Sequence, residues 1–391
     1  MSDMQGKLLV VDDNEMNRDM LSRRLSRRKH TVITAENGQQ ALDLIERESF
    51  DVILLDIMMP GISGIEVLRR LRESYSAADL PIIMATAKSE SEDIVEALKL
   101  GANDYVTKPL NFPVVLARVG TQLSLKKAQD ALKSAHDRMK NDLDAAAEIQ
   151  QTLLPYNLPE IDTLSIAWKF YPCDELAGDF LNIFQLSENE IGIYVVDVMG
   201  HGVPAALLSF SVSRNLSPLA GPDSIVLNSG DTPSSVSPAE VLTRLNTLYP
   251  FQINKDRFFT ILYGVLDIRD RQFRYASAGH PGPLLVSSGQ SAQEITAKGF
   301  PIGIVEEPDY EQSEIALKPG DRMYLYSDGF IEETNKDGKH FEINRFQESV
   351  KSHYSSTLDQ SLENTLNAII SWRGSEHLSD DLSIIGIEVK R

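Results

Sequence analysis

The sequence predicts an α/β unit, then a long helix, then an α+β unit. Five apolar runs alternate with helical segments from residue 7 to about 120, which is typical of a doubly wound, five-stranded parallel sheet of the flavodoxin-like class. No proline occurs from Leu116 to Leu154, so a helix can run through this stretch without a break. From about residue 160, many short strands occur beside a few helices, which indicates a layered α+β architecture.

The elements of the first unit follow from apolar runs, helical spacing and stop signals. Gly101, for example, ends the fourth helix. Strands are expected at 7–11, 31–35, 51–55, 81–86 and 104–107, and helices at 14–28, 38–48, 65–74 and 91–101.

The helix between the units carries a heptad pattern. Leucine, methionine or alanine recurs every seven residues at Leu125, Leu132, Met139, Ala146 and Leu153, and Ala128, Ala135 and Ile149 lie three residues after members of this series. The pattern falters at Asp142, and Pro155 ends the helix. Such a narrow apolar seam predicts a coiled coil that joins two copies of the chain as a homodimer. The alternative is a solvated spacer helix that packs only on its own chain.

The second unit is predicted from short β-rich runs. Strands are expected at 165–172, 180–186, 190–198, 258–268, 272–279, 283–288, 322–329 and 382–389, and helices at about 203–216, 238–248 and 359–372. The segment 218–237 is rich in proline, glycine and serine, so a mobile surface loop or flap is expected there. The domain boundaries that follow are 1–122, 123–154 for the linker and 155–391.

Composition limits the function classes. The formal net charge of −19 argues against nucleic-acid binding and fits protein partners and divalent cations. Cys173 is the single cysteine, which excludes an internal disulfide and favours a reducing compartment. The N-terminus is too short and too acidic for a signal peptide, and no apolar run is long enough to cross a bilayer. A cytoplasmic protein without a membrane partner is therefore expected.

Polar residues stand at the ends of the strands predicted for the first unit. They are Asp12, Asp13, Asp56, Thr86 and Lys108. Sites gather at the carboxyl ends of parallel strands, and close carboxylates favour a hard cation such as Mg²⁺. Taken singly, each aspartate is as readily a turn residue; five positions together indicate a phosphoryl-binding site.

Residues 7 to about 122 resemble a response-regulator receiver domain, through the motifs "VVDD", "LLDIMMPGISG", "ATA" and "YVTKP". The resemblance implies that Asp56 accepts a phosphoryl group from a histidine kinase. It also implies that Mg²⁺ is held by Asp12, Asp13, Asp56 and the carbonyl of Met58, that Thr86 and Lys108 bind the phosphoryl group, that Tyr105 reorients on activation, and that the Lys108–Pro109 bond is often cis.

In the second unit, an aspartate ends or precedes each of four strands. Asp197 follows a buried run, Asp179 and Asp328 stand beside glycines, and Asp380 precedes the last strand together with Asp381. Oxygen ligands without a histidine or cysteine cluster favour Mg²⁺ or Mn²⁺ over zinc. A single Asp-Gly pair is most often just a turn, but the fourfold pattern indicates a pair of cations.

These motifs, with "IQQTLLP", "FFTILYGVLD", "ASAGHPGPLL" and "GFPIGI", resemble the PPM-type serine/threonine phosphatases, of the bacterial branch that regulates sigma factors by partner switching. The resemblance covers about residues 145 to 390. It implies a layered β-sandwich flanked by helices, and two Mn²⁺ or Mg²⁺ that activate a water for attack on a phosphoserine. The implied metal ligands are Asp179, Asp197, the carbonyl of Val198, Asp328 and Asp380. The implied substrate is a phosphorylated anti-sigma-factor antagonist.

Two departures and several alternatives accompany this resemblance. The family often has two glycines before the first aspartate, where this chain has Ala177 and Gly178, and the 218–237 loop looks longer than usual. His201 is either the acid that protonates the leaving serine oxygen or a residue that only stabilises its loop. His280 is expected to be structural. The other function class is an adaptor, in which a phosphatase-like unit binds a partner without catalysis.

Overall fold

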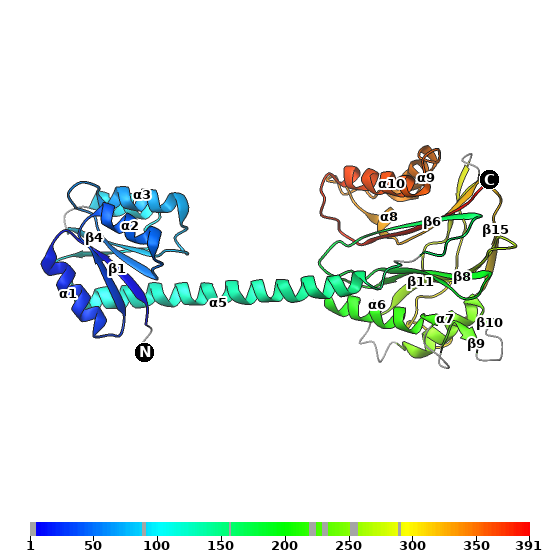
Figure 1. Ribbon diagram of the computed structural model, residues 1–391, viewed down its shortest axis with the longest axis horizontal. Helices are drawn as coiled ribbons and strands as arrows, with labels where there is room; N and C mark the ends of the chain where they lie inside the picture. The colour runs from blue at the N-terminus through cyan, green and yellow to red at the C-terminus, as the bar shows by residue number, and fades with distance from the viewer. Residues whose placement is uncertain are drawn as a thin grey trace. The chain divides into compact units, whose positions relative to one another are not determined.

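The computed structural model describes residues 5–87, 91–155, 158–218, 224–228, 234–250, 257–287 and 291–391, and the chain divides into two compact units at residues 140 and 141 (Figure 1). Among the described residues, no helix is both long and apolar enough to cross a membrane.

The first unit is the doubly wound parallel sheet that the sequence predicts, with strand order β2-β1-β3-β4-β5. Its elements are β1 Lys7–Val11, α1 Glu15–Ser26, β2 Thr31–Ala35, α2 Gly38–Arg47, β3 Val52–Asp56, α3 Gly64–Ser74, β4 Ile82–Ala87, α4 Ser91–Lys99 and β5 Asp104–Lys108. Alternate residues of β1 point to opposite faces: Leu9 and Val11 belong to one buried cluster, and Leu8 and Val10 to another. Burial on both faces explains why the strands are continuous apolar runs.

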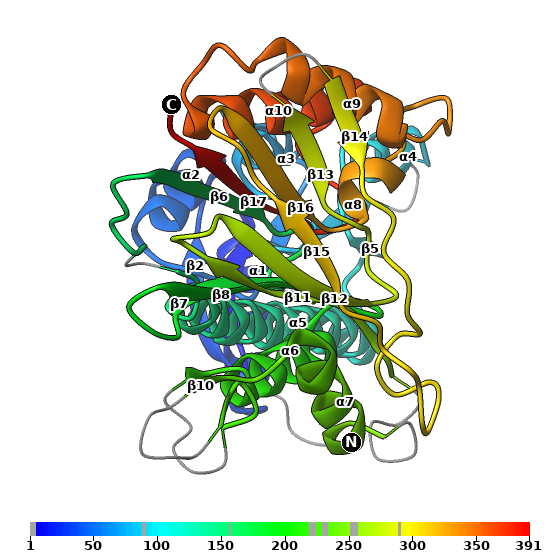
Figure 2. The ribbon, with the colours of Figure 1, turned by 90° about the vertical axis from the view of Figure 1, so that its right-hand side faces the viewer.

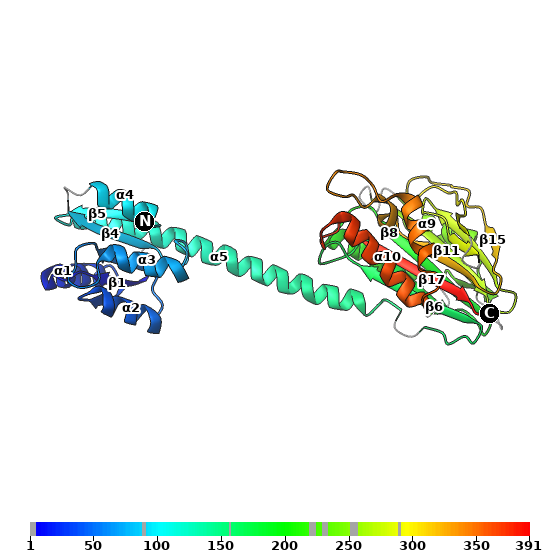
Figure 3. The same cartoon turned by 90° about the horizontal axis from the view of Figure 1, so that it is seen from above.

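Helix α5, Phe112–Gln151, begins in the first unit and ends in the second (Figure 3). Val115, Val119 and Leu123 bury its first turns against the receiver-like sheet. Beyond that point the heptad residues Leu125, Leu132 and Met139 are exposed. The helix is therefore about as long as predicted, and the middle of its apolar seam is exposed, whereas Leu153 at the end of the seam packs against the core of the second unit.

The second unit contains two five-stranded sheets, as Figure 2 shows. One has the order β15-β12-β11-β8-β7 and the other β14-β13-β16-β17-β6, and neighbouring strands in both orders pair antiparallel. The strands are β6 Leu164–Tyr171, β7 Phe180–Gln185, β8 Glu190–Val198, β11 Phe259–Asp267, β12 Gln272–Ala278, β13 Leu284–Ser287, β14 Ser291–Glu294, β15 Ser313–Ala316, β16 Asp321–Tyr326 and β17 Leu382–Val389. Inward-facing apolar residues of both sheets form one core between them.

Helices cover the outer faces of this sandwich. Helices α6 Val203–Asn215 and α7 Pro238–Leu248 pack on the first sheet, and α9 Glu342–Ser352 and α10 Leu358–Arg373 on the second, with the single turn α8 Gly329–Glu332 between β16 and α9 (Figures 1 and 2). The layered α+β prediction is confirmed. Sequence patterns missed α8, α9 and the short strands β14 and β15.

The segment expected to be a mobile loop lies partly outside the described residues, which exclude 219–223 and 229–233. Its described part is anchored. Two short strands, β9 Leu227–Asn228 and β10 Ser234–Ser235, pair antiparallel, and Ile225, Val226 and Val236 are buried in the main core. The expectation of a surface loop missed these apolar anchors.

Candidate functional site

In the first unit, Asp12, Asp56 and Lys108 meet at one edge of the sheet. The Nζ atom of Lys108 lies 2.6 Å from Oδ2 of Asp56 and 3.0 Å from Oδ2 of Asp12. Oxygen atoms of Asp12, Asp13 and Asp56 all lie within 4.8 Å of one another. The parallel register explains this convergence, because β1, β3 and β5 all end at the same edge.

Burial changes the acid–base properties of this cluster. Asp56 is 2% exposed, and this burial raises the pKa of its carboxyl group, while the Lys108 hydrogen bond acts in the opposite direction. Such a carboxylate is stabilised by a cation beside it. Thr86 is also buried, the backbone of Met58 contacts Asp56, and the Lys108–Pro109 bond is cis. The structure thus brings together Asp12, Asp13, Asp56 and Lys108, while Thr86 lies at the end of the neighbouring strand β4 and Tyr105 packs against one of the two core clusters of this unit.

In the second unit, strand register places two of the four aspartates side by side. Phe180 of β7 pairs with Val196 of β8, so Asp179 just before β7 lies opposite Asp197 near the end of β8. Gly178 allows the chain before Asp179 to pass close to the backbone that follows Asp197. A Cβ atom on it would lie 3.0 Å from the carbonyl oxygen of Val198 and 2.9 Å from that of Gly200. Of the two glycines that the family often has before this aspartate, the chain keeps Gly178, and Gly178 is the one that the close contact with the Val198 and Gly200 carbonyl groups requires.

The other two aspartates come from the opposite sheet. Asp328 follows β16 and is the N-cap of α8, and Asp380 lies two residues before β17, the strand paired with β16. Gly329 allows the two segments to meet, since a Cβ atom there would lie 2.3 Å from the carbonyl oxygen of Asp381. One edge of the sandwich therefore carries carboxylates from both sheets.

The pKa values of these aspartates indicate that their negative charges are not compensated by positive charges within the set. Burial, and then the charge of Asp328, raises the pKa of Asp197 to about 8. Burial and Asp380 raise the pKa of Asp328 to about 6, and burial and Asp197 raise the pKa of Asp179. The Oδ2 atom of Asp179 is buried without a hydrogen-bond partner among the described residues. These oxygens fit divalent cations, which would restore the charged forms.

Asp381 has a different position from its neighbour Asp380. Its Oδ2 accepts hydrogen bonds from the backbone amides of Gly178 (2.7 Å) and Asp179 (3.2 Å), and its Oδ1 accepts one from Cys173 (2.8 Å). Asp381 therefore holds the turn that presents Asp179. These two roles could not be separated from the sequence, because Asp380 and Asp381 stand side by side before the last strand.

Sequence reasoning also missed Gln150 and Glu332. Gln150, in the last turn of α5, is buried and donates from Nε2 to the carbonyl of Ala177 (2.8 Å), while its Oε1 accepts from the Ala177 amide (3.2 Å). Glu332, at the end of α8, lies close enough to Asp328 and Asp380 for its charge to raise the pKa of each. Only the proximity of Glu332 to "YSDG" hinted at this in the sequence.

The two histidines occupy contrasting places. His201 is 77% exposed, and its Nδ1 lies 3.6 Å from a carboxylate oxygen of Asp174. His280 is buried, its Nδ1 lies 2.7 Å from Oγ1 of Thr260, and Thr260 pairs with Asp197 across β11 and β8. Burial lowers the pKa of His280 to about 3, so its ring is neutral. His280 thus supports the strand beside Asp197.

Comparisons with known proteins agree with both halves of this description. The family described as the response regulator receiver domain matches residues 8–120, and the family described as stage II sporulation protein E (SpoIIE) matches residues 187–390. The fold and the two sites thus define a response regulator whose second unit is of the PP2C phosphatase type. Since the second match spans just over half of the chain, this protein belongs to the SpoIIE family.

Two relatives illustrate the likeness. The chain is 28% identical over 260 residues to the phosphoserine phosphatase RsbU of Bacillus subtilis, which covers 66% of this chain and 73% of RsbU. The solved SiaA-PP2C domain of Pseudomonas aeruginosa matches with a TM-score of 0.53 and 24% identity, over 65% of this chain and 98% of that domain. The second comparison establishes the fold of the second unit.

Proposed function

We propose that this chain is a response regulator in which phosphorylation of Asp56 controls a metal-dependent protein serine/threonine phosphatase. The observation that carries the proposal is the convergence of Asp179, Asp197, Asp328 and Asp380 at one edge of the sandwich, on the same chain as a complete receiver site. The units proposed are the receiver at 1–122, the linker at 123–154 and the phosphatase at 155–391.

In the receiver, the buried carboxylate of Asp56 is the phosphoryl acceptor. Its oxygen forms a bond to phosphorus as the phosphorus–nitrogen bond of a phosphohistidine on a histidine kinase breaks. Lys108 is already within 2.6 Å of this oxygen and would offset the added negative charge. Asp12, Asp13 and the carbonyl of Met58 would hold Mg²⁺ beside it, because hard cations prefer oxygen ligands.

In the phosphatase unit, the four aspartates and the carbonyl of Val198 would hold two Mn²⁺ or Mg²⁺. When bound, such a pair supplies an activated water and offsets charge on the phosphoryl oxygens. The chain's own residues position this site: Asp381 holds the Asp179 turn, and Gly178 lets the Val198 carbonyl approach. His201 stands on the exposed loop after β8, where it can give a proton to the leaving serine oxygen.

The proposed substrate is a phosphoserine protein, an anti-sigma-factor antagonist of a partner-switching pathway. The printed function of RsbU, a phosphoserine phosphatase, supports this class of substrate. The alternative, an adaptor that only binds such a partner, is disfavoured because a non-catalytic unit has no need of four carboxylates gathered at one edge, among them the buried Asp179, which is costly without a cation. The exposed seam of Leu125, Leu132 and Met139 supports a homodimer joined along α5.

The test is a phosphatase assay on the full chain. Phosphoserine forms of candidate anti-sigma-factor antagonists are incubated with Mn²⁺, with and without prior treatment by acetyl phosphate, and released phosphate is measured. We expect hydrolysis that changes with acetyl phosphate in the wild type and does not change in Asp56→Asn. Stable binding of the phosphorylated antagonist without phosphate release would support the adaptor instead.

A further inference from the structure

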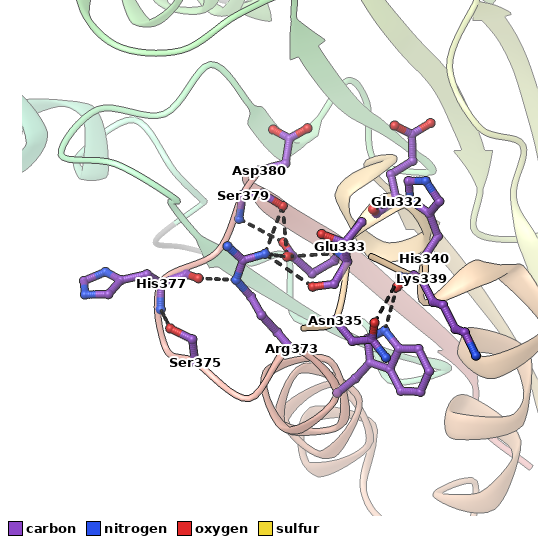
Figure 4. A network of polar contacts seen from close by, with 12 residues as sticks. Glu332, Glu333, Asn335, Lys339, His340, Arg373, Ser375, His377, Ser379 and Asp380 are labelled. Atoms are coloured by element: carbon purple, nitrogen blue, oxygen red, sulfur yellow. Dashed lines mark hydrogen bonds and ion pairs between the residues drawn. The ribbon is translucent and has the colours of Figure 1, made fainter. Parts of the chain in front are cut away.

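A partly buried ion pair, formed by Glu333 and Arg373, lies beside the metal-ligand candidates of the second sheet. Glu333 directly follows α8, and its side chain has no exposed surface. Its carboxylate accepts hydrogen bonds from Nη1 of Arg373, from the backbone amide of Ser379 (3.0 Å) and from the hydroxyl of Ser379 (2.9 Å), as Figure 4 shows. The amide of Thr334 adds a fourth, at 3.2 Å.

Arg373 joins three segments of the chain. It is the last residue of α10, and Gly374 ends that helix in the left-handed conformation with φ of 71°. Besides binding Glu333, its Nε donates to the carbonyl of His377, and its Nη1 lies 3.2 Å from the hydroxyl of Ser379 (Figure 4). The end of α8, the end of α10 and the loop 375–380 are thus tied at one point.

The two ends of this network lead to the metal-ligand candidates. Ser379 directly precedes Asp380 in the chain. Glu333 directly follows α8, the single turn of helix for which Asp328 is the N-cap. Asp328 is partly exposed and Asp380 is exposed, and their segments are in close contact, since a Cβ atom on Gly329 would lie 2.3 Å from the carbonyl oxygen of Asp381. Two like charges in this position repel each other, so without a restraint the loop that carries Asp380 would move away from α8.

We propose that Glu333 and Arg373 are positioning residues that hold Asp380 against Asp328 in the arrangement that a divalent-cation pair requires. This inference rests on the proposed metal site of the phosphatase unit. A carboxylate with four donors and a guanidinium with acceptors on two segments fixes the loop in one geometry. Outer residues that orient metal ligands typically change metal affinity by about 10–100-fold when replaced.

The test compares Mn²⁺ binding with folding in the full chain. Glu333→Gln keeps the size of the side chain but removes its charge, Arg373→Lys keeps the charge but removes the fork, and Ser379→Ala removes one hydroxyl. Arg345→Lys is the matched control, since Arg345 stacks on Trp372 near this network and contributes none of its hydrogen bonds. All variants carry Asp13→Asn to weaken cation binding by the receiver.

Bound Mn²⁺ is measured by electron paramagnetic resonance, and folding by thermal unfolding. We expect Glu333→Gln and Arg373→Lys to weaken Mn²⁺ binding by roughly tenfold or more. We also expect their hydrolysis of p-nitrophenyl phosphate to recover at high Mn²⁺ with an unchanged KM, while Arg345→Lys binds as the parent does.

Parent-like Mn²⁺ affinity in a folded Glu333→Gln protein would overturn the inference. If Glu333→Gln does not fold, parent-like affinity in both Arg373→Lys and Ser379→Ala overturns it. A parent protein that binds no Mn²⁺ in its second unit would overturn the proposed metal site itself, which is a distinguishable result.

Discussion

Replacing Gln150 by leucine should loosen the turn that presents Asp179. The Gln150 amide is buried and makes two hydrogen bonds to the backbone of Ala177, two residues before Asp179. Leucine has a similar volume but neither a donor nor an acceptor. The substitution therefore leaves the carbonyl and the amide of Ala177 without their side-chain partner, in a place where water has little access.

The size of the effect follows from these two bonds. A buried hydrogen bond contributes about 1 kcal/mol net, so losing both should lower the free energy of opening this turn by about 2 kcal/mol. Because about 1.4 kcal/mol corresponds to a factor of ten, the open form should become roughly 30 times more populated. The Asp381 bonds to Gly178 and Asp179 remain, so the turn should loosen rather than unfold.

Hydrogen exchange followed by mass spectrometry measures this directly. Peptides that cover residues 174–181 should exchange faster in Gln150→Leu, and Mn²⁺-dependent hydrolysis should need more Mn²⁺ for half of its maximum. Gln151→Leu is the matched control, because Gln151 is the exposed neighbour on the same helix. Exchange and Mn²⁺ dependence equal to those of Gln151→Leu would refute the reasoning.

Four further predictions concern the separate sites. Asp56→Asn should abolish acid-labile phosphate uptake from acetyl phosphate in the presence of Mg²⁺; uptake equal to wild type would contradict the receiver assignment. Asp197→Ala should reduce hydrolysis by more than about 10³-fold, and chelator should have the same effect on the wild type until Mn²⁺ is restored, because the metal site contributes several kcal/mol; full activity in excess chelator would exclude it. Leu132→Asp combined with Met139→Asp should give a monomer by light scattering whose activity no longer responds to receiver phosphorylation; a monomeric wild type would refute the coiled coil. Burial lowers the pKa of His280 from 6.5 in the unfolded chain to about 3 in the folded protein. As the pH falls below 6.5, only the unfolded state gains a proton at this residue. The free energy of unfolding should therefore fall by about 1.4 kcal/mol per pH unit, down to about pH 3. The denaturation difference between wild type and His280→Asn should follow that slope, and a pH-independent difference would show that the ring is not buried and neutral.

The sequence predicted the first unit almost completely, and the physical reason is its regularity. A parallel sheet buried on both faces needs unbroken apolar strands such as 52–55, and each following helix begins with a capping residue such as Asn14, Asn37 or Ser63. Since all strands end at one edge, a residue that ends a strand is already placed in three dimensions. Asp56 and Lys108 could therefore be brought together without coordinates.

The second unit was predictable in its long strands and not in its supports. Asp179, Asp197, Asp328 and Asp380 were singled out in the sequence because each stands at or beside a strand end. Glu333 and Arg373 were not, since a charged residue after a short turn and another at a helix end are ordinary surface residues by pattern. The burial of Glu333 and its pairing with Arg373 depend on contacts between segments 40 residues apart, which no local periodicity records. Helix α9 was missed because its buried face consists of few residues, chiefly Phe346 and Val350.

The supports of the metal-ligand candidates differ in a way that bears on control. In the arrangement proposed above, Asp328 and Asp380 are held together by Glu333 and Arg373, which lie wholly within the second unit, directly after α8 and at the end of α10. Asp179 is held from two sides, by Asp381 in the segment before β17 and, through Ala177, by Gln150 in the last turn of α5.

A rotation or shift of α5 would therefore act first on Asp179, while the Asp328 and Asp380 side keeps its geometry. Asp381 resists that change, because its carboxylate holds the same turn. The strength of coupling is then set by the balance between one glutamine and one aspartate, each with two hydrogen bonds to this turn. A change of a few kcal/mol would shift this balance, and coupling free energies between two sites are typically of that size.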